Sequence, residues 1–162
     1  MTAHREISAH TRPESKERLR LWLRLLKVSR AIEVELRERF RVEFATTLPR
    51  FDVMSALDRY PDGLKMSELS KDLKVSNGNV TVIVDRLLQD GFILREAVPG
   101  DRRAARIRLT REGQQEFSMQ AAAHEAWVDA LLDEVDADQA AELSVLLNRI
   151  AKPSAEDKSD GS

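Results

Sequence analysis

Five arginines lie within ten positions of this chain, at residues 102, 103, 106, 108 and 111. A guanidinium group forms paired hydrogen bonds with phosphate oxygens, so a cluster this dense is typical of a surface that binds a phosphate backbone. Upstream of the cluster, Ser76 and Asn77 open a run with helical periodicity. Hydroxyl and amide side chains at a helix start can reach base edges or phosphates. Together the two features indicate binding to nucleic acid.

The distribution of charge supports this interpretation more than its total does. The formal net charge is −2, which identifies no partner. Residues 65–111 hold ten basic and six acidic residues, whereas residues 112–162 hold three basic and twelve acidic ones. A basic segment in a nearly neutral chain is the electrostatic pattern of a phosphate binder. A solvated charged hairpin is the alternative, and at this point it stays open.

Composition excludes several classes of protein. Hydrophobic residues make up 42% and charged residues 33% of the 162 residues, which favours long amphipathic helices. Six Gly and five Pro are too few for a many-stranded sandwich, and the lack of Cys excludes disulfides and thiolate zinc sites. No apolar run approaches the roughly 20 residues of a membrane span, and the first residues lack the apolar segment of a secretory signal. We expect a soluble, cytoplasmic, mostly helical protein.

Hydrophobic spacing and capping residues predict the helices. A long helix is expected from an N-cap at Ser15 to Phe44, and Pro49 opens a second helix that ends at the turn 61–63. A short helix follows at 67–73. Val75 and Ser76 then suit the staple and N-cap positions of another helix, which Gly91 ends.

The remaining elements are a hairpin and two helices. Residues 92–109 change to a period of two around the turn 99–101, which predicts a two-stranded hairpin with a basic tip. Thr110 caps a long helix through roughly Glu134, and Asp136-x-x-Gln139 is a capping box for a last helix. Residues 1–14 lack periodicity and are expected to form a flexible arm, and residues 153–162 a disordered tail.

The order of short helix, turn, helix and basic hairpin predicts a winged helix-turn-helix, mainly α with a small β-wing. The helix that begins near Ser76 would enter the major groove. Its outer face carries Val82, with Thr81 and Arg86 at its flanks. Val82 suits a thymine methyl group, although a scattered surface valine explains it equally well. Asp85 would repel phosphates unless it pairs with a wing arginine, and the alternative is an ordinary exposed acid.

Three segments together resemble the MarR family of transcriptional regulators: VDRLLQDGFI, the wing triplet Asp101–Arg102–Arg103, and LTREG after a strand. The resemblance covers about residues 48–117. It implies that Arg103 enters the minor groove, that Asp101 orients it, and that Arg102 contacts phosphate or pairs with Asp85. The stretch SNGNVTVIVDRL is similar to a subgroup that includes regulators of aromatic-acid catabolism. The expected DNA-binding residues are Ser76, Asn77, Asn79, Thr81, Val82, Arg86, Asp101, Arg102 and Arg103.

The terminal helices carry more apolar surface than a wing domain of about 60 residues can cover, which predicts a homodimer. Family members pair through these helices, and pairing sets two recognition helices about 34 Å apart on a pseudo-palindromic site. Repression is the family's usual mode. The expected domains are the arm at 1–14, a dimerisation and ligand helix at 15–47, the DNA-binding lobe at 48–110, dimerisation helices at 111–152, and the tail.

The resemblance also implies a small-molecule effector, here an aromatic acid or its acyl-CoA thioester. An arginine-rich stretch of the first helix would suit the phosphates of such a thioester. Apolar residues at helical spacing are, however, more often core than ligand contacts. The candidate ligand-binding residues are Arg20, Trp22, Arg24, Ser29, Phe44, Phe51, Met54 and His124.

Other function classes have less support. The chain offers no nucleophile motif, no Gly-rich phosphate loop and no paired carboxylates in an apolar setting, so we expect no enzyme and no cofactor. A metal-responsive regulator would need ligands such as His4, Glu6, His10 and His124, which lack zinc-ligand spacing. We therefore expect no metal. A DNA-binding protein that responds to no ligand is the remaining alternative.

Overall fold

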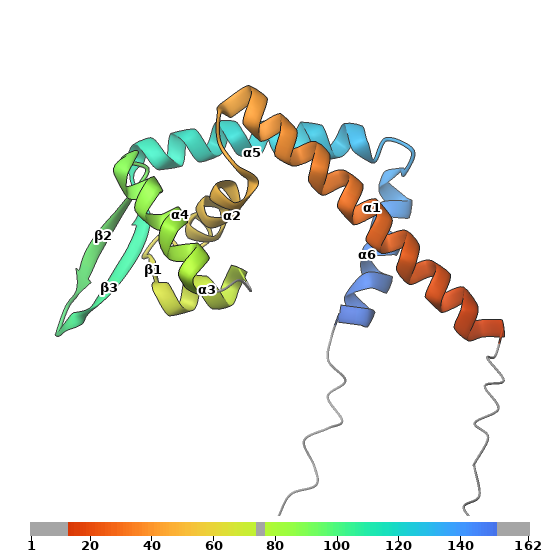
Figure 1. Ribbon diagram of the computed structural model, residues 1–162, viewed down its shortest axis with the longest axis horizontal. Coiled ribbons are helices and arrows are strands. Elements are labelled where there is room, and N and C mark those ends of the chain that lie inside the picture. Colours follow the sequence, from red (N-terminus) through yellow and green to blue (C-terminus); the bar gives the residue numbers. More distant parts are fainter. Residues whose placement is uncertain (1–12, 74–76, 152–162) are drawn as a thin grey trace, which may run out of the picture. The chain divides into compact units, whose positions relative to one another are not determined.

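The computed structural model describes residues 13–73 and 77–151, apart from the side chains of Pro13, Asn77, Gly78 and Arg102. These residues form six helices and three short strands (Figure 1). The predicted fold class, mainly α with a small β-wing, is confirmed. The chain divides into two compact units between Glu125 and Ala126.

Helix α1 (Pro13–Phe44) is held along its length by ion pairs between neighbouring turns. Glu33 pairs with Arg37 at 2.6 Å and Glu35 with Arg39 at 2.7 Å, both four residues apart. Such pairs add a few tenths of a kcal/mol each. The helix begins two residues before the predicted N-cap Ser15, because proline is a favoured residue type at the first helical position.

Helix α3 (Met66–Leu73) is the first helix of the helix-turn-helix, and helix α2 (Leu48–Asp58) packs against it. The side chain of Thr47 accepts a hydrogen bond from the Arg50 N–H at 3.3 Å and caps α2. Glu68 accepts a hydrogen bond from the Lys65 N–H at 2.8 Å before the start of α3. These local bonds satisfy amide groups that each helix start leaves unpaired.

The sheet has three strands rather than the two predicted. Strands β1 (Leu64–Lys65), β2 (Ile93–Val98) and β3 (Asp101–Leu109) lie in the order β1-β3-β2, and all pairs are antiparallel. Strand β1 has only two residues, so it has no detectable period. Its pairing also depends on Gly63, whose φ of +88° and contact with the Ile107 carbonyl leave no room for a Cβ.

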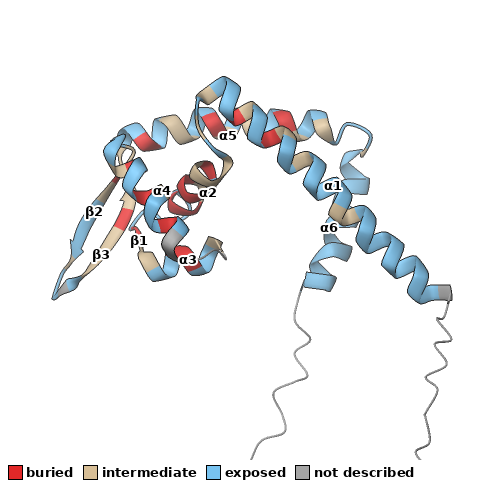
Figure 2. Ribbon diagram, in the orientation of Figure 1, coloured by how far each residue is buried: buried red, intermediate tan, exposed pale blue. Residues whose placement is uncertain are grey.

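Helix α4 (Asn77–Gln89) packs against this framework through one face. Val80, Val84 and Leu87 are fully buried in a core that α2, α3 and the sheet share (Figure 2). Gly91 ends the helix as predicted, with a φ of +75° and with the Phe92 N–H donating to the Leu87 carbonyl.

Helices α5 (Arg111–Leu131) and α6 (Ala137–Ala151) complete the described chain. Two predicted caps are confirmed: Thr110 Oγ1 accepts from the Gly113 N–H at 3.0 Å, and Asp136 and Gln139 exchange bonds of 2.9 and 3.1 Å. Helix α5 ends three residues before the predicted Glu134. No residue of α6 is buried.

Candidate nucleic-acid interface

Burial of one face of α4 exposes the opposite face. Thr81, Val82, Asp85 and Arg86 are all exposed, and the Val82 residue retains 56% of its accessible surface. An exposed valine between polar neighbours is compatible with a contact to a thymine methyl group. The outer face of α4 therefore presents hydroxyl, apolar and guanidinium groups from one rigid element.

The wing positions Arg103 through an irregularity in its ladder. Ala97 pairs with Ala105, but the next residue, Val98, pairs with Asp101. Residues 102–104 thus stand outside the regular pairing of β3 with β2. This bulge follows a two-residue turn in which Gly100 has a φ of +83°. A bulge bends a strand and redirects its side chains, and the Arg103 side chain is exposed here.

Asp101 holds the backbone of this bulge. Its Oδ1 accepts a hydrogen bond from the Arg103 N–H at 3.0 Å. Such a bond from an aspartate to a backbone amide two residues later is an Asx turn, which stabilises a tight local conformation. Asp101 therefore acts on the Arg103 backbone in this structure, and the predicted orientation of the Arg103 side chain by Asp101 stays a prediction.

Two arginines of the basic run have structural partners. Arg106 donates to the Gly63 carbonyl at 3.0 Å and so fastens the turn before β1 to β3. Arg108 donates to Glu96 at 2.6 Å across the hairpin, and this hydrogen bond holds the pKa of Glu96 below its usual range. Arg95, Arg103 and Arg111 are exposed and form no ion pair with a side chain in the described part of the chain.

Asp85 has no ion-pair partner among the side chains that the structure describes. The predicted pair with Arg103, Arg106 or Arg108 is therefore not formed here. Arg102, the other predicted partner, has a side chain outside the described ones. Ser76 and the side chain of Asn77 also lie outside them, so their predicted DNA contacts stay predictions.

The predicted ligand-binding residues fall into two groups. The rings of Phe51 and His124 lie tilted to each other with centroids 4.8 Å apart, and both lie beside Phe40, 4.8 and 6.0 Å from its ring. The Phe44 ring lies 6.3 Å from the Phe40 ring, and Met54 is buried in the core. These residues form one aromatic cluster at the junction of α1, α2 and α5.

The second group lies far along α1 and is exposed: Arg20, Trp22, Arg24 and Ser29. Trp22 and Phe44 are separated by about 33 Å along the helix axis, at 1.5 Å per residue. No small ligand bridges that length. The two groups can share one site only where a second copy brings its own α1 to the cluster.

Arg37 and Asp52, which the sequence did not predict as site residues, line a cavity of about 500 Å³ with Asn79 and Val82 of α4. Desolvation raises the pKa of the Asp52 carboxyl group. The charges of His124 and Arg37 lower this pKa, and the charge of Glu33 raises it. The available signal was an acid inside the apolar run Phe51–Asp52–Val53–Met54. An acid there must face away from the core, and here it faces the space beside α4.

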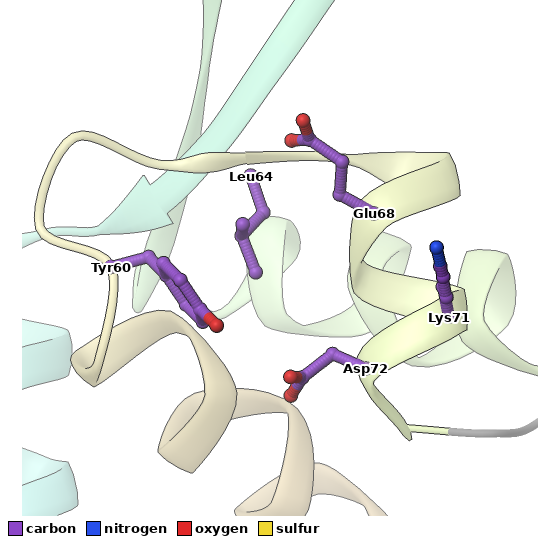
Figure 3. Close-up of a pocket in the computed structure, with 5 residues that line it drawn as sticks. All are labelled: Tyr60, Leu64, Glu68, Lys71 and Asp72. Atoms are coloured by element: carbon purple, nitrogen blue, oxygen red, sulfur yellow. The ribbon is translucent and has the colours of Figure 1, made fainter. Parts of the chain in front are cut away.

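A second hollow lies between the end of α2 and α3 (Figure 3). It has a volume of about 480 Å³ and is lined by Tyr60, Leu64, Glu68, Lys71 and Asp72. Its acids already have partners: Asp72 accepts from Arg59 at 2.7 Å, and Glu68 caps the start of α3. These contacts explain the two acids as part of the fold.

The described residues hold no cluster of three or more His, Cys, Asp or Glu that could bind a metal. His4, Glu6 and His10, which the metal-sensor alternative requires, lie outside the described residues. Within the described chain, no helix has the length and apolar character that crossing a bilayer requires.

Comparison with known proteins gives consistent similarities. The model of the MarR family matches residues 46–105. The chain is 30% identical over 90 residues to the HTH-type transcriptional regulator BilQ of Clostridium symbiosum, a match that covers 56% of this chain and 62% of BilQ. It is 28% identical over 130 residues to the HTH-type transcriptional regulator PecS of Dickeya dadantii, covering 79% of this chain and 78% of PecS.

Among solved structures, a MarR family transcriptional regulator from Silicibacter pomeroyi is 33% identical, with a TM-score of 0.71. That similarity covers 86% of this chain and 96% of the other. It therefore includes the long helices on both sides of residues 46–105 as well as the sheet and α4.

Proposed function

This chain belongs to the MarR family of transcriptional regulators, and from that premise we propose that it binds duplex DNA as a homodimer. Helix α4 enters the major groove, and the β2–β3 wing reaches an adjacent minor groove. One observation carries the proposal. The exposed face of α4 and the exposed Arg103 of the bulged wing belong to the same compact unit. We propose DNA binding rather than catalysis as the function.

The two elements have different roles on DNA. Asn77, Asn79, Thr81 and Val82 lie where an α4 inserted into the groove meets base edges, whereas Arg86 at its flank suits phosphate. At the wing, Arg103 suits a narrow minor groove, whose negative potential is strongest in A·T-rich sequence. Ser76 and Arg102 are proposed as phosphate contacts beside these elements, and Asp101 supports the wing tip.

Binding to sites selected from a randomised duplex pool tests the proposal. Arg103→Ala should weaken binding more on sites with A·T-rich flanks than on the same sites with G·C flanks, and Arg103→Lys should restore only part of the loss. Arg86→Ala should weaken binding on all sequences and reduce the salt slope by about 0.9. Arg41→Ala is the matched control, because Arg41 is exposed on α1 and pairs with Glu38. A wild-type affinity for DNA that depends on neither salt concentration nor DNA sequence would refute the proposal.

Dimerisation is supported by exposed apolar side chains on the terminal helices. On α6, five apolar residues are 44–69% exposed: Leu143, Val145, Leu146, Leu147 and Ile150. On α1, Trp22 is 56% and Leu23 54% exposed. Exposed apolar side chains in such numbers on each of these helices mark interaction sites, and a second copy of the chain would cover them. Leu146→Glu should turn the dimer into a monomer in sedimentation experiments, while the helical signal of the fold is retained.

We further propose that a small aromatic acid, or its acyl-CoA thioester, releases a repressor of this kind from its operator. The support is the cavity that Arg37 and Asp52 share with Val82, because an occupant there touches the outer face of α4. Arg24, Lys27 and Arg30 are exposed on α1 without an ion pair among the described side chains, which suits the phosphates of a thioester. A thermal-shift screen with aromatic acids and their CoA thioesters, repeated with DNA present, tests the effector class.

A further inference from the structure

A further hollow lies between the wing and the start of α3. It has a volume of about 360 Å³, and its lining residues come from β1, α3, β2 and β3. Three of them are basic: Lys65 of β1, Arg95 of β2 and Arg103 of β3. None of the described residues that line the hollow is acidic. Three strands therefore contribute basic residues to one place.

The hollow exists because the sheet carries small side chains beyond the core. Arg95 pairs with Ile107 across the hairpin, so both side chains lie on the same face of the sheet. Ala105 lies two residues from Ile107 on β3 and faces the same way, and its partner on β2 is Ala97. Strand β1 has only two residues, so it does not continue along the wing. Beyond Ile107, the wing therefore leaves space next to the start of α3.

The basic residues of the hollow have no counter-charge in the part of the chain that the structure describes. Arg95 and Arg103 are exposed and Lys65 is half-buried, and none of the three forms an ion pair with a described acidic side chain. Like charges gathered around one hollow repel one another, and an anion bound between them relieves this repulsion.

The nearest acids in the sequence are directed elsewhere. Glu68, in the first turn of α3, accepts the Lys65 backbone N–H and lines the hollow between α2 and α3 instead. Glu96 follows Arg95 on β2, so its side chain lies on the opposite face of the sheet, where it pairs with Arg108. The fold thus keeps carboxylates away from the basic hollow.

These groups match the chemistry of a phosphate. Guanidinium groups bind phosphate oxygens through paired hydrogen bonds, and an ammonium group adds a point charge. The hydroxyl of Ser67, an exposed residue of the first turn of α3 that lines the same hollow, offers a neutral donor of the kind that contacts DNA phosphates.

The proposed docking on DNA brings a phosphate to this place. One sugar–phosphate backbone separates a major groove from the adjacent minor groove, so a protein with α4 in one groove and the wing in the other must straddle that backbone. We propose, resting on the proposed function, that the hollow binds a backbone phosphate between the two grooves, with Lys65, Ser67 and Arg95 as its contacts. Arg103 reaches past the hollow into the minor groove. Such a contact fixes the position of the wing relative to α4 on the duplex.

Neutral phosphates locate the contact. In a duplex selected by the wild-type protein, single phosphates are replaced in turn by methylphosphonates, which carry no charge, and the affinity of the full-length protein is measured at fixed salt. In each half-site, one replacement between the bases that α4 reads and the flank that Arg103 reads should weaken wild-type binding about tenfold. The same replacement should weaken binding of the double variant Lys65→Gln/Arg95→Gln less than about twofold, because its partner charges are already absent.

Salt dependence and a control variant test the residues on the unmodified duplex. The double variant should bind all sequences more weakly, and its slope of log affinity against log salt should fall by about 0.9 per half-site. It should unfold at the wild-type temperature or above, since it loses like charges and no ion pair. Lys71→Gln is the matched control, because Lys71 is exposed on α3 but lines the other hollow, and its affinity should equal that of the wild type.

Two results would overturn the proposal and leave the proposed function intact. A replacement scan that costs the double variant as much as the wild type at every phosphate would show that no DNA phosphate occupies the hollow. If the double variant binds DNA like the wild type, and inorganic phosphate without DNA saturates an NMR shift of the Arg95 Nε–H, the hollow belongs to a free phosphorylated molecule. A wild-type protein that binds no duplex would instead refute the proposed function, and this proposal with it.

Discussion

Replacement of Gly113 by alanine should destabilise the protein, although helix propensity alone predicts the opposite. Gly113 lies in the first turn of α5, where alanine is about 1 kcal/mol more favourable than glycine. A Cβ at this position would, however, lie 1.9 Å from the carbonyl oxygen and 2.8 Å from the carbonyl carbon of Phe92. Both are backbone atoms, so no rotamer change relieves the overlap, and the first turn of α5 must move away.

The size of the decrease in the free energy of unfolding follows from the contacts that this movement breaks. The Thr110 N–H donates to the Phe92 carbonyl at 3.0 Å, and the Thr110 hydroxyl donates to the Gly91 carbonyl at 2.7 Å. Loss of two such bonds costs about 2 kcal/mol, and a disturbed Thr110 cap about 1 kcal/mol more. After about 1 kcal/mol is regained from helix propensity, Gly113→Ala should lower the free energy of unfolding by about 2 kcal/mol.

Urea unfolding followed by circular dichroism at one fixed protein concentration measures this difference. Gln115→Ala is the control, because Gln115 is exposed two residues along the same helix and its replacement should change stability by less than about 0.5 kcal/mol. A Gly113→Ala protein as stable as the wild type would show that α5 adjusts at no cost, and the close approach to Phe92 would then not explain the glycine.

Three further predictions concern single residues. Ala45 has a φ of +49°, so Ala45→Gly should raise the free energy of unfolding by about 0.5 kcal/mol, visible as a higher thermal midpoint. Folding raises the pKa of Asp52 and therefore takes up a proton, so the contribution of Asp52 to stability falls as pH rises through the interval between its ordinary and its raised pKa. Asp52→Asn should remove that decrease, and urea midpoints should favour the variant increasingly as the pH rises above the ordinary aspartate pKa of about 4. Asp101→Ala should weaken DNA binding in gel-shift titrations at fixed salt, because it releases the Arg103 backbone. Tighter binding would mean that repulsion between the Asp101 carboxylate and the DNA phosphates outweighs this structural role.

Local chemistry made much of the fold predictable from sequence. The Thr110 cap, the Asp136–Gln139 capping box and the Gly91 helix end each depend on residues within a few positions of one another, and all three are confirmed. The buried face of α4 followed in the same way, since the spacing of Val80, Val84 and Leu87 places them on one side of any helix.

Contacts between distant residues were decided only by the tertiary structure. Strand β1 exists because Leu64 pairs with Ile107, and two residues are too few to show a period in the sequence. In the sequence, the arginines between residues 102 and 111 look equivalent. In the structure, Arg106 supports the turn at Gly63 and Arg108 pairs with Glu96, so these arginines differ in their availability for contacts with DNA. The residues next to Gln120 and Arg50 in the sequence do not indicate that polar atoms of these two side chains are left without hydrogen bonds. Their buried, unsatisfied atoms arise where α2 and α5 meet, because hydrogen-bond satisfaction depends on the whole surroundings of an atom, which residue order does not specify.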